Sequence, residues 1–422
     1  MEQRLSTQPY KGARDFYPQD MQVENYIFDT WRKVCKSFGF EEYSFPIIEP
    51  FEIFASKTGE EIVNEQLYSF EDKGGRKIAI RPELTPGTVR MIAQKYKETS
   101  QPIKWFMIGN NWRYEKPQTG RGREFYQLEA NVFGVPGVEA DFEIFQLIVA
   151  IMQAFGAKEN MYQIKVSDRR LVNALLNDVL KLDGEVQAKV RRLMDKREKL
   201  SREDFMASLM DLGLNESQIK EIEQFISSDF ENLNIPKNNP GYQTLQRLFI
   251  CLKGTEIDRY IKFDASIIRG FDYSDGLVYE VFDNNPNNRR SIFGGERFDK
   301  LINIFGDYEL PSTGFAMGDY TLLEFLKGWD LLPEFDSGID YLVTVWPSNG
   351  PKFLLRSLEI ADKLRSQGKN VVCWLDTDSK LEKQLKYADK KGIPQAVILG
   401  EEELQKGVMT VKNLKTGEQI TS

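Results

Sequence analysis

The chain has 422 residues, of which 41% are hydrophobic and 28% are charged, and its formal net charge is −8. This length predicts two or three domains, and the composition is that of an ordinary globular protein. The negative charge excludes a protein that binds nucleic acid through bulk positive charge, so any RNA contact must come from local basic patches.

The chain contains no histidine. It therefore lacks the usual general acid–base group at neutral pH and the commonest metal ligand. Reactions at phosphorus depend on positioning and charge neutralisation, so they can proceed without a histidine. Three widely separated cysteines predict neither a disulfide nor a zinc site. With no apolar leader and no membrane-length run, we expect a cytoplasmic protein without a membrane partner.

The first predicted elements are a helix over 21–38, ended by Gly39, and a bent strand over 40–54. Proline cannot donate to a strand ladder, so Pro46 and Pro50 favour an edge or interface strand. A kinked edge strand without a partner chain is the alternative.

A hairpin is predicted next, from strands at 67–71 and 77–80 around the turn DKGGR. Its second strand leads into RPELTP (81–86), and a helix is expected from about 87 to 97. Glu83 and Thr85 lie at this strand-to-helix junction. An acid and a hydroxyl at such a place can cap the helix or bind a ligand.

The most informative stretch is WRYEKPQTGRGREFYQLEANVFG, residues 112–134. Apolar alternation on both sides predicts two antiparallel strands, and the basic loop between them contains two glycines. Side chains of alternate parity share one strand face, so Phe125, Gln127 and Asn131 should point into one pocket below the arginines. Arginines on such a loop suit a polyphosphate, although a solvated hairpin is the simpler interpretation.

The middle of the chain predicts a helix over 138–155, a strand over 161–166 and a charged, wholly helical segment to about 253. Strands follow at 261–264 and 276–282, separated by SIIRGFDYSDG. Arg269 in this connection is flanked by apolar residues and needs an anionic partner, which is either a structural acid such as Asp272 or a ligand.

The order RYEKPQTGRGREF resembles motif 2 of the histidyl enzymes among class II aminoacyl-tRNA synthetases. RPELT, RGFDYSDG and the start KGARDFYP are similar to further signatures of that family. The resemblance implies an ATP-dependent ligase that joins L-histidine to tRNA through an aminoacyl adenylate. It also implies a homodimer, with Pro46 in the motif that forms the interface, and magnesium accompanying ATP.

Residue roles are implied by the same resemblance. Arg113 and Arg269 would be catalytic and would neutralise charge at the α-phosphate. ATP would contact Arg113, Glu115, Arg121 and Phe125, and the tRNA acceptor end would contact Lys116 and Gln118. The amino acid would be bound by a larger set, namely Glu83, Thr85, Arg113, Gln127, Asn131, Arg269, Tyr273 and Ser274. No resident metal, prosthetic group or DNA partner is expected.

Several positions depart from the family pattern. Asn131 replaces an acid, Ser274 replaces a second tyrosine, and Glu296 replaces a glycine. In the segment that resembles motif 3, Thr321 stands where an arginine normally holds the ATP γ-phosphate. Arg121, Arg123 and Arg297 are the candidates to replace it. Two rivals follow from these departures: a paralogue with another amino-acid specificity, and a non-catalytic tRNA-binding protein.

After a linker at 333–338, strands alternate with helices, which predicts a small α/β domain. Its sequence is similar to the anticodon-binding domain of histidyl enzymes. The expected architecture is thus an α+β class II catalytic domain over 1–332, with an antiparallel sheet, flanking helices and a helical insertion at about 170–255. The anticodon-binding α/β domain follows over 339–422.

Overall fold

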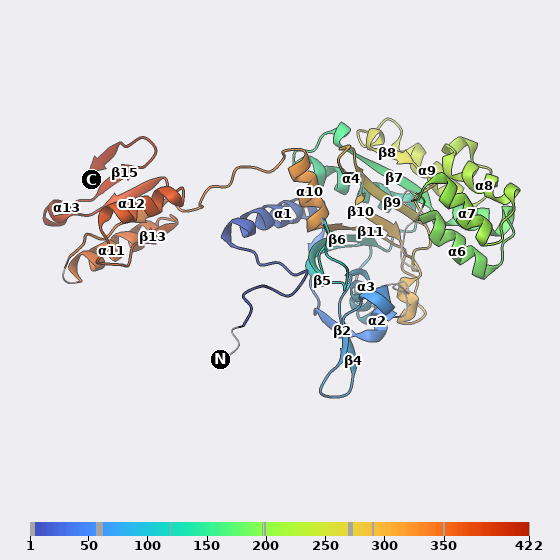
Figure 1. Cartoon of the computed structure of the whole chain (residues 1–422), viewed down its shortest axis with the longest axis horizontal. Coiled ribbons are helices and arrows are strands. Elements are labelled where there is room, and N and C mark those ends of the chain that lie inside the picture. The colour runs from blue at the N-terminus through green and yellow to red at the C-terminus, as the bar shows by residue number, and fades with distance from the viewer. Residues whose placement is uncertain are drawn as a thin grey trace. The chain divides into compact units, whose positions relative to one another are not determined.

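The computed structural model describes residues 5–55, 62–118, 120–195, 197, 200–268, 273–288, 291–348 and 351–421. The chain divides into two compact units, Met1–Leu332 and Pro333–Ser422. Each is described by itself (Figure 1). In the part of the chain that the structure describes, no helix has the length and apolar character needed to cross a membrane.

The first unit is built on an eight-stranded sheet. Its strands, in sheet order, are β1 (Glu41–Glu42), β5 (Ile103–Trp112), β6 (Glu124–Phe133), β11 (Ser312–Gly318), β10 (Ser291–Arg297), β9 (Leu277–Asp283), β7 (Tyr162–Asp168) and β8 (Ile261–Phe263). The six central strands are antiparallel, as predicted, but both edge pairs, β1–β5 and β7–β8, are parallel. Parallel neighbours need a long crossover, and long connections precede both β5 and β8.

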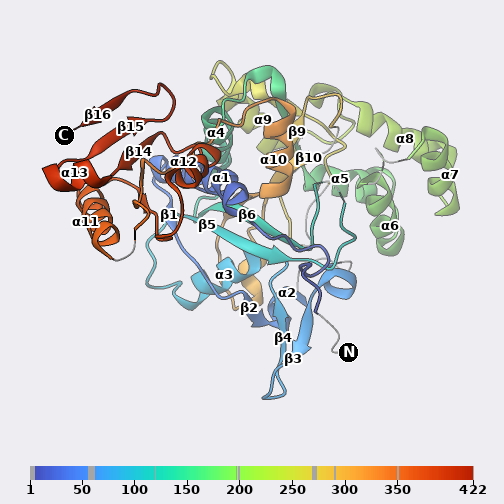
Figure 2. The ribbon, with the colours of Figure 1, turned by 60° about the vertical axis from the view of Figure 1, so that its left-hand side comes forward.

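Helices cover one face of this sheet. They are α1 (Pro18–Ser37), α4 (Val138–Ala154) and α10 (Asp319–Gly328). Leu128, Ala130 and Val132 of β6 belong to the hydrophobic core that these helices complete. Because side chains alternate along a strand, the intervening residues of β6 point to the opposite face. Figure 2 shows β5 and β6 side by side, with α1 and α3 (Thr85–Gln94) near them.

A three-stranded sheet precedes β5, in the order β2 (Ile48–Pro50), β4 (Lys77–Ile80) and β3 (Ser69–Glu71). The predicted hairpin and the edge position of the proline-containing strand are confirmed. The prediction of a strand through residue 54 was wrong, because Phe51–Ala55 forms α2. That turn buries Ile53 and Phe54 against Ala79. Helix α3 begins two residues earlier than predicted, since Pro86 is tolerated in a first turn.

The segment between β7 and β8 is helical, as predicted. Its helices are α5 (Arg169–Ala174), η3 (Leu175–Val179), α6 (Gly184–Asp195), α7 (Arg202–Asp211), α8 (Glu216–Ser227), η5 (Phe230–Asn232), α9 (Pro240–Leu252) and η6 (Asp258–Tyr260). Shorter turns elsewhere are η1 (Ile62–Gln66), η2 (Glu159–Met161) and η7 (Leu301–Ile304). Apolar side chains such as Phe205 and Ile222 extend the main core into this segment.

The second unit has a five-stranded sheet. Its parallel part, β13 (Val371–Cys373), β12 (Tyr341–Val343) and β14 (Gln395–Ile398), agrees with the predicted α/β pattern. Helices α11 (Lys352–Ser366) and α12 (Leu381–Lys390) contribute to two separate core clusters. Helix α13 (Glu401–Lys406) and the antiparallel strands β15 (Thr410–Asn413) and β16 (Gln419–Thr421) were not predicted, since that stretch is mostly polar.

Candidate active site

The face of β6 opposite the helices of the main core presents polar side chains in a row. Gln127, Glu129 and Asn131 alternate with the core residues of the same strand, so the predicted common face of Gln127 and Asn131 is confirmed. On the neighbouring strand β11, Gly314 is paired with Asn131. A Cβ atom on Gly314 would lie 1.8 Å from Oδ1 of Asn131. The glycine therefore leaves the space that the Asn131 amide fills.

Glu129 lies at the centre of this row and is only 1% exposed. Its Oε2 atom accepts a hydrogen bond from Oγ1 of Thr85 at 2.8 Å. Its Oε1 atom accepts from Oγ1 of Thr88 at 2.9 Å and from Nδ2 of Asn131 at 2.8 Å. The Tyr43 hydroxyl donates to the same oxygen at 3.3 Å. Burial raises the pKa of Glu129 to about 7, although the bonds from Thr85, Thr88 and Asn131 act in the opposite direction.

Glu83 and Tyr273 meet beside this row. The Tyr273 hydroxyl donates to Oε2 of Glu83 at 2.7 Å, across 190 residues of sequence. Burial raises the pKa of Tyr273 well above its ordinary value, and the Glu83 carboxylate acts in the same direction. Tyr273 therefore remains a protonated donor. The structure thus brings together four of the residues predicted for the amino acid, namely Glu83, Thr85, Asn131 and Tyr273.

Arg113 follows β5 and is held by the chain that precedes α3. Its Nε atom donates to the carbonyl oxygen of Pro82 at 2.8 Å, and its guanidinium lies 5.3 Å from the ring centroid of Phe125. Burial lowers the pKa of Arg113, while the nearby carboxylates of Glu83 and Glu115 raise it. An arginine keeps its charge through such shifts, so a half-buried cation lies between the polar row and the basic loop.

Gln127 is oriented from the adjacent strand. Its Oε1 atom accepts from Nδ2 of Asn111 at 3.0 Å, which leaves the Gln127 amide nitrogen as a donor. Gln127 is paired with Gly109 on one side and Gly318 on the other. Neither neighbour has a side chain that would cover the amide.

The basic loop between β5 and β6 narrows to a turn in which Gln118 and Arg121 exchange backbone hydrogen bonds. Gly120 has a φ of 75°, which favours glycine. The Arg121 side chain is 48% exposed, and its guanidinium lies 3.3 Å from Oε2 of Glu115. Lys116 is exposed as well.

Two of the three arginines considered for the γ-phosphate are already engaged. Arg297 forms a buried ion pair with Asp141 at 2.6 Å and donates to the carbonyl oxygen of Gly137. Arg123 donates to the Tyr10 hydroxyl at 2.8 Å and packs against the Tyr114 ring. Both interactions join the arginines to other elements of the same unit, so these side chains have structural roles. Arg121 is the remaining candidate.

The two residues that precede Thr321 in motif 3, Asp319 and Tyr320, have structural roles. Asp319, the first residue of α10, is buried and forms an ion pair with Arg14 from the N-terminal segment. Its Oδ1 atom accepts from the backbone N–H of Tyr126 at 3.0 Å. The Arg14 guanidinium also lies 3.6 Å from the Tyr320 ring centroid. Residues 319–320 therefore attach the N-terminal segment to the end of β6.

Some predicted residues are not placed in this site. Arg269 and Asp272 lie outside the described residues. Ser274 is 5% exposed, and among the described residues its buried Oγ atom has no hydrogen-bond partner. In the part of the chain that the structure describes, no group of three or more Asp, Glu or Cys side chains is arranged to hold a metal ion.

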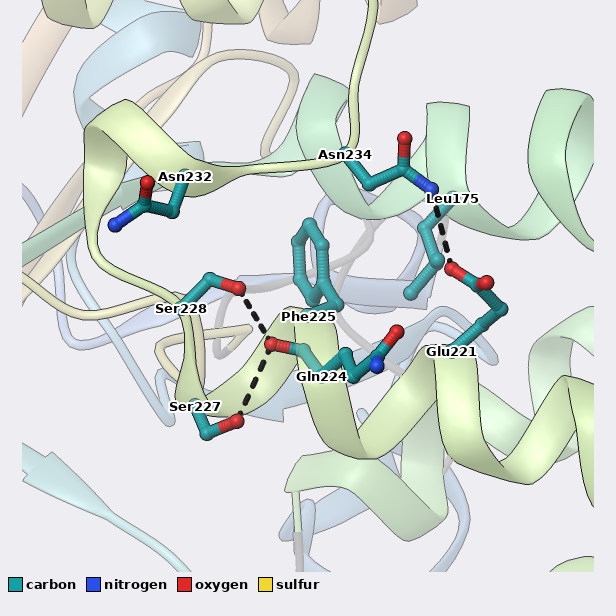
Figure 3. A pocket seen from close by; sticks show the side chains of 8 residues that line it. All are labelled: Leu175, Glu221, Gln224, Phe225, Ser227, Ser228, Asn232 and Asn234. Carbon is teal, nitrogen blue, oxygen red and sulfur yellow. Dashed lines mark hydrogen bonds between the residues drawn. The ribbon is translucent and has the colours of Figure 1, made fainter.

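A hollow of about 350 Å³ lies elsewhere, beside α8 in the helical segment (Figure 3). The hydroxyls of Ser227 and Ser228 donate to the backbone carbonyl of Gln224, and Asn234 donates to Glu221. These polar groups are bonded to one another, and no arginine or lysine lines the hollow. It therefore lacks the positive charge that Arg113 supplies beside β6.

Two residues of the site, Glu129 and Gly314, were not predicted from the sequence. The alternation of β6 places Glu129 on the pocket face, but only the fold reveals its hydrogen bonds to Thr85 and Thr88 on α3. Gly314 carries no local sequence signal. Its role depends on the pairing of β11 with β6, 183 positions away in the chain.

Replacing Gly314 with alanine tests the close approach of β11 to Asn131. The new Cβ would overlap Oδ1 of Asn131 and would lie 2.5 Å from the backbone oxygen of Ala130, so the amide must turn away and β11 must shift against β6. Because the resemblance assigns Asn131 to the binding of an amino acid, we expect the KM for that amino acid to rise about tenfold, the effect of losing one hydrogen bond. The KM for ATP should not change. A substrate KM equal to that of the parent would show that the Asn131 amide can move without consequence.

The chain matches two known sequence families. Residues 12–321 match a family described as histidyl-tRNA synthetase, and residues 342–422 match the anticodon binding domain. It is 38% identical to a histidine–tRNA ligase of Leptospira biflexa over 426 aligned positions, which cover 100% of this chain and 96% of the relative. It is 37% identical to a histidine–tRNA ligase of Thermoplasma volcanium, with 97% and 94% covered.

Solved structures agree in fold. Histidyl-tRNA synthetase from Nostoc sp. PCC 7120 superposes with a TM-score of 0.80 at 22% identity, covering 99% of this chain and 97% of that one. The apo histidyl-tRNA synthetase of S. aureus gives a TM-score of 0.73 at 21% identity. These matches confirm the predicted class II architecture and its second domain. The chain therefore belongs to the histidyl-tRNA synthetase family.

Proposed function

We propose that the polar row on β6, with Glu83, Tyr273 and Arg113, is the site at which this chain activates histidine. As a member of its family, the chain uses ATP to ligate L-histidine to tRNA through an aminoacyl adenylate. One observation carries the assignment of the site. A half-buried arginine and a group of buried acceptors lie together beside one sheet face.

The first step is attack of the histidine carboxylate on the α-phosphorus of ATP, which releases pyrophosphate. Arg113 and Arg269 neutralise the negative charge that develops at the α-phosphate. The fixed Nε bond of Arg113 to Pro82 leaves its terminal nitrogens for this purpose. The acyl group then passes to the 3′ end of the tRNA. Magnesium that arrives with ATP supplies further neutralisation of the phosphate oxygens.

The amino acid is bound through complementary hydrogen bonds. The α-ammonium group is placed against Glu83 and Thr85, a carboxylate and a hydroxyl that are both buried. The imidazole is placed against Asn131, with Tyr273, Ser274, Gln127 and Arg269 completing the pocket. Gln127 contributes its amide nitrogen.

ATP and tRNA are assigned to the basic loop. Phe125 stacks on the adenine, Glu115 binds its edge, and Arg121 meets the γ-phosphate in place of the arginine that Thr321 replaces. The exposure of the Arg121 guanidinium supports this role. Lys116 and Gln118 face the acceptor end of the tRNA.

We propose two domains for this chain and a homodimeric assembly. Residues 1–332 form the catalytic domain, with the insertion at about 170–255, and residues 339–422 bind the anticodon. A homodimer through the segment around Pro46 is supported by exposed Ile47, Ile48 and Phe70 on the small sheet. Three cysteines without disulfides in the structure suit the cytoplasm.

ATP–pyrophosphate exchange with each of the twenty amino acids tests this function. Exchange dependent on histidine alone is the expected result. Exchange with another amino acid instead would identify a paralogue of altered specificity. No exchange with any amino acid, together with tight tRNA binding, would indicate that catalysis has been lost.

A further inference from the structure

Glu129 is a buried carboxylate that forms no ion pair with any other residue that the structure describes. Its four hydrogen bonds come from two threonines, one tyrosine and one asparagine. The nearby Arg81 guanidinium donates instead to the backbone carbonyls of Asn110 and Phe45. A carboxylate in such surroundings is costly to keep ionised. Its presence therefore suggests that its charge has a use.

The hydrogen bonds of Glu129 determine which atoms of its neighbours face the pocket. An ionised carboxylate can only accept, so each neighbour must donate to it. Thr85 has one hydroxyl proton, and once this points to Glu129 only oxygen lone pairs remain for a ligand. Asn131 donates through Nδ2, which turns its Oδ1 atom toward Gly314. Both side chains are thereby set as acceptors.

Histidine offers donors to those two acceptors. Its α-ammonium group has only N–H donors, and one nitrogen of a neutral imidazole is also a donor. A threonine or an asparagine can in principle donate or accept, so neither alone selects for donors. A group that fixes their orientation supplies that selection.

We propose that Glu129 is a positioning residue that makes Thr85 and Asn131 acceptors for the ammonium and imidazole N–H groups of histidine. This inference rests on the proposed amino-acid site. It assigns to Glu129 the negative charge that Asn131 lacks. Glu129 lies two positions from Asn131 on the same strand face, and its charge acts on the substrate through the Asn131 amide.

The variant Glu129→Gln separates this role from simple space filling. Glutamine has nearly the same shape, but its amide nitrogen must face one of the donors that the carboxylate accepted. Either the Thr85 hydroxyl or the Asn131 amide then reverses its orientation. The reversed group points an O–H or N–H donor at an N–H donor of the substrate. The KM for histidine in pyrophosphate exchange should rise about tenfold, as expected for one hydrogen bond. The kcat and the KM for ATP should change less than about threefold.

A matched control is Glu49→Gln. Glu49 is 6% exposed and its carboxylate pairs with Arg90 of α3, outside the pocket. This variant removes a buried carboxylate from the same region and should lower thermal stability. It should leave the KM for histidine unchanged. An equal rise in KM for both variants would show that Glu129 acts only through the stability of α3.

The double variant Glu129→Gln with Asn131→Asp is the decisive measurement. The amide introduced at position 129 donates to the carboxylate introduced at position 131, and that carboxylate accepts from the imidazole directly. The KM for histidine should therefore return to within about threefold of the parent value. A purely structural role of Glu129 predicts no such recovery. Persistence of the full defect in the double variant would overturn the proposal.

The pH dependence supplies a second readout. The pKa of Glu129 is raised to about 7, so its acceptor function is complete above that pH and is lost as the pH falls through it. The groups that face it are Tyr43, Glu83 and Arg81, while β5 and β11 place Met107 and Ala316 beside it. The parent KM should rise from pH 8 to pH 6 more steeply than that of Glu129→Gln.

Free histidine titrates in the same range, but its contribution is common to both proteins and cancels in the comparison. Identical pH profiles would count against the role of Glu129. These outcomes are distinct from failure of the proposed site. If the parent exchanged with histidine and no substitution in the row on β6 changed the KM, the site itself would be wrongly placed.

Discussion

Replacing Arg113 with alanine is expected to slow histidine-dependent pyrophosphate exchange by about 10²–10³-fold, the range seen when one donor to a developing oxyanion is removed. Arg113 is half-buried, so its charge acts partly through a medium that screens it less than water does. The bond from its Nε atom to Pro82 fixes the plane of the guanidinium before the substrates arrive. The defect should appear mainly in kcat, because charge at the α-phosphorus builds up during attack.

Lysine at position 113 should restore little activity. It can supply the charge, but it lacks the planar pair of donors and cannot both bond to Pro82 and reach the phosphate. Arg32→Ala is a suitable control, because Arg32 is partly exposed and forms surface ion pairs with Asp29 and Glu42. That variant should exchange at the parent rate. A rate for Arg113→Ala within about threefold of the parent would remove Arg113 from the catalytic step.

The strand faces of the site were predictable because they depend on local periodicity. The alternation along β6 predicts that Phe125, Gln127 and Asn131 share one face, and the turn DKGGR predicts the hairpin of β3 and β4. Local periodicity was less reliable where the apolar run was short. The apolar residues at 51–55 fit a helical turn as well as they fit a strand. The segment forms a helical turn, in which Phe54 is buried against Ala79.

What could not be predicted depends on contacts between distant segments. The sequence shows that Thr321 replaces an arginine of the family pattern. It does not show that Asp319, two positions earlier, pairs with Arg14, 305 positions away. The same limitation applies to Arg297. The residues next to Arg297 in the sequence do not indicate that its guanidinium forms an ion pair with Asp141 on α4. Only the fold reduces the three candidate arginines to Arg121.

The pocket chemistry illustrates a further limit. The change from an acid to Asn131 was visible, and it suggested a loss of charge in the amino-acid pocket. The compensating carboxylate of Glu129 lay two positions away on the same predicted face. Its importance depended on whether α3 covers it, because an exposed glutamate at that point would be an ordinary surface residue. Burial by Thr85 and Thr88 makes it part of the site.

Replacing Asn131 with leucine should reduce kcat/KM for histidine by about a hundredfold or more. Leucine has the same branched arrangement of four side-chain heavy atoms but is bulkier and apolar, and the substitution removes two hydrogen bonds at once. The imidazole N–H loses its acceptor, and Glu129 loses the donor that lies 2.8 Å from its Oε1 atom. Sites that read a ligand by hydrogen bonds strongly disfavour any pairing that leaves a buried polar group unmatched.

Asn131→Asp should behave differently and keep histidine as its substrate. The new carboxylate would lie at hydrogen-bond distance from that of Glu129, and two carboxylates so close share one proton. The shared proton takes the place of the amide N–H. Activity should therefore fall as the pH rises, when the pair loses that proton and the two charges repel each other. Exchange assays from about pH 6 to pH 9 measure this effect.

The control for both variants is Asn110→Leu. Asn110 lies on the adjacent strand β5, on the opposite face from the pocket, where its amide donates to Glu124. This change alters an asparagine of the same sheet without touching the amino-acid site, so kcat/KM for histidine should stay within about threefold of the parent. If Asn131→Leu also activates histidine as efficiently as the parent, then Asn131 does not read the side chain. Specificity for imidazole would then have to reside in the other proposed pocket residues, namely Tyr273, Ser274, Gln127 and Arg269.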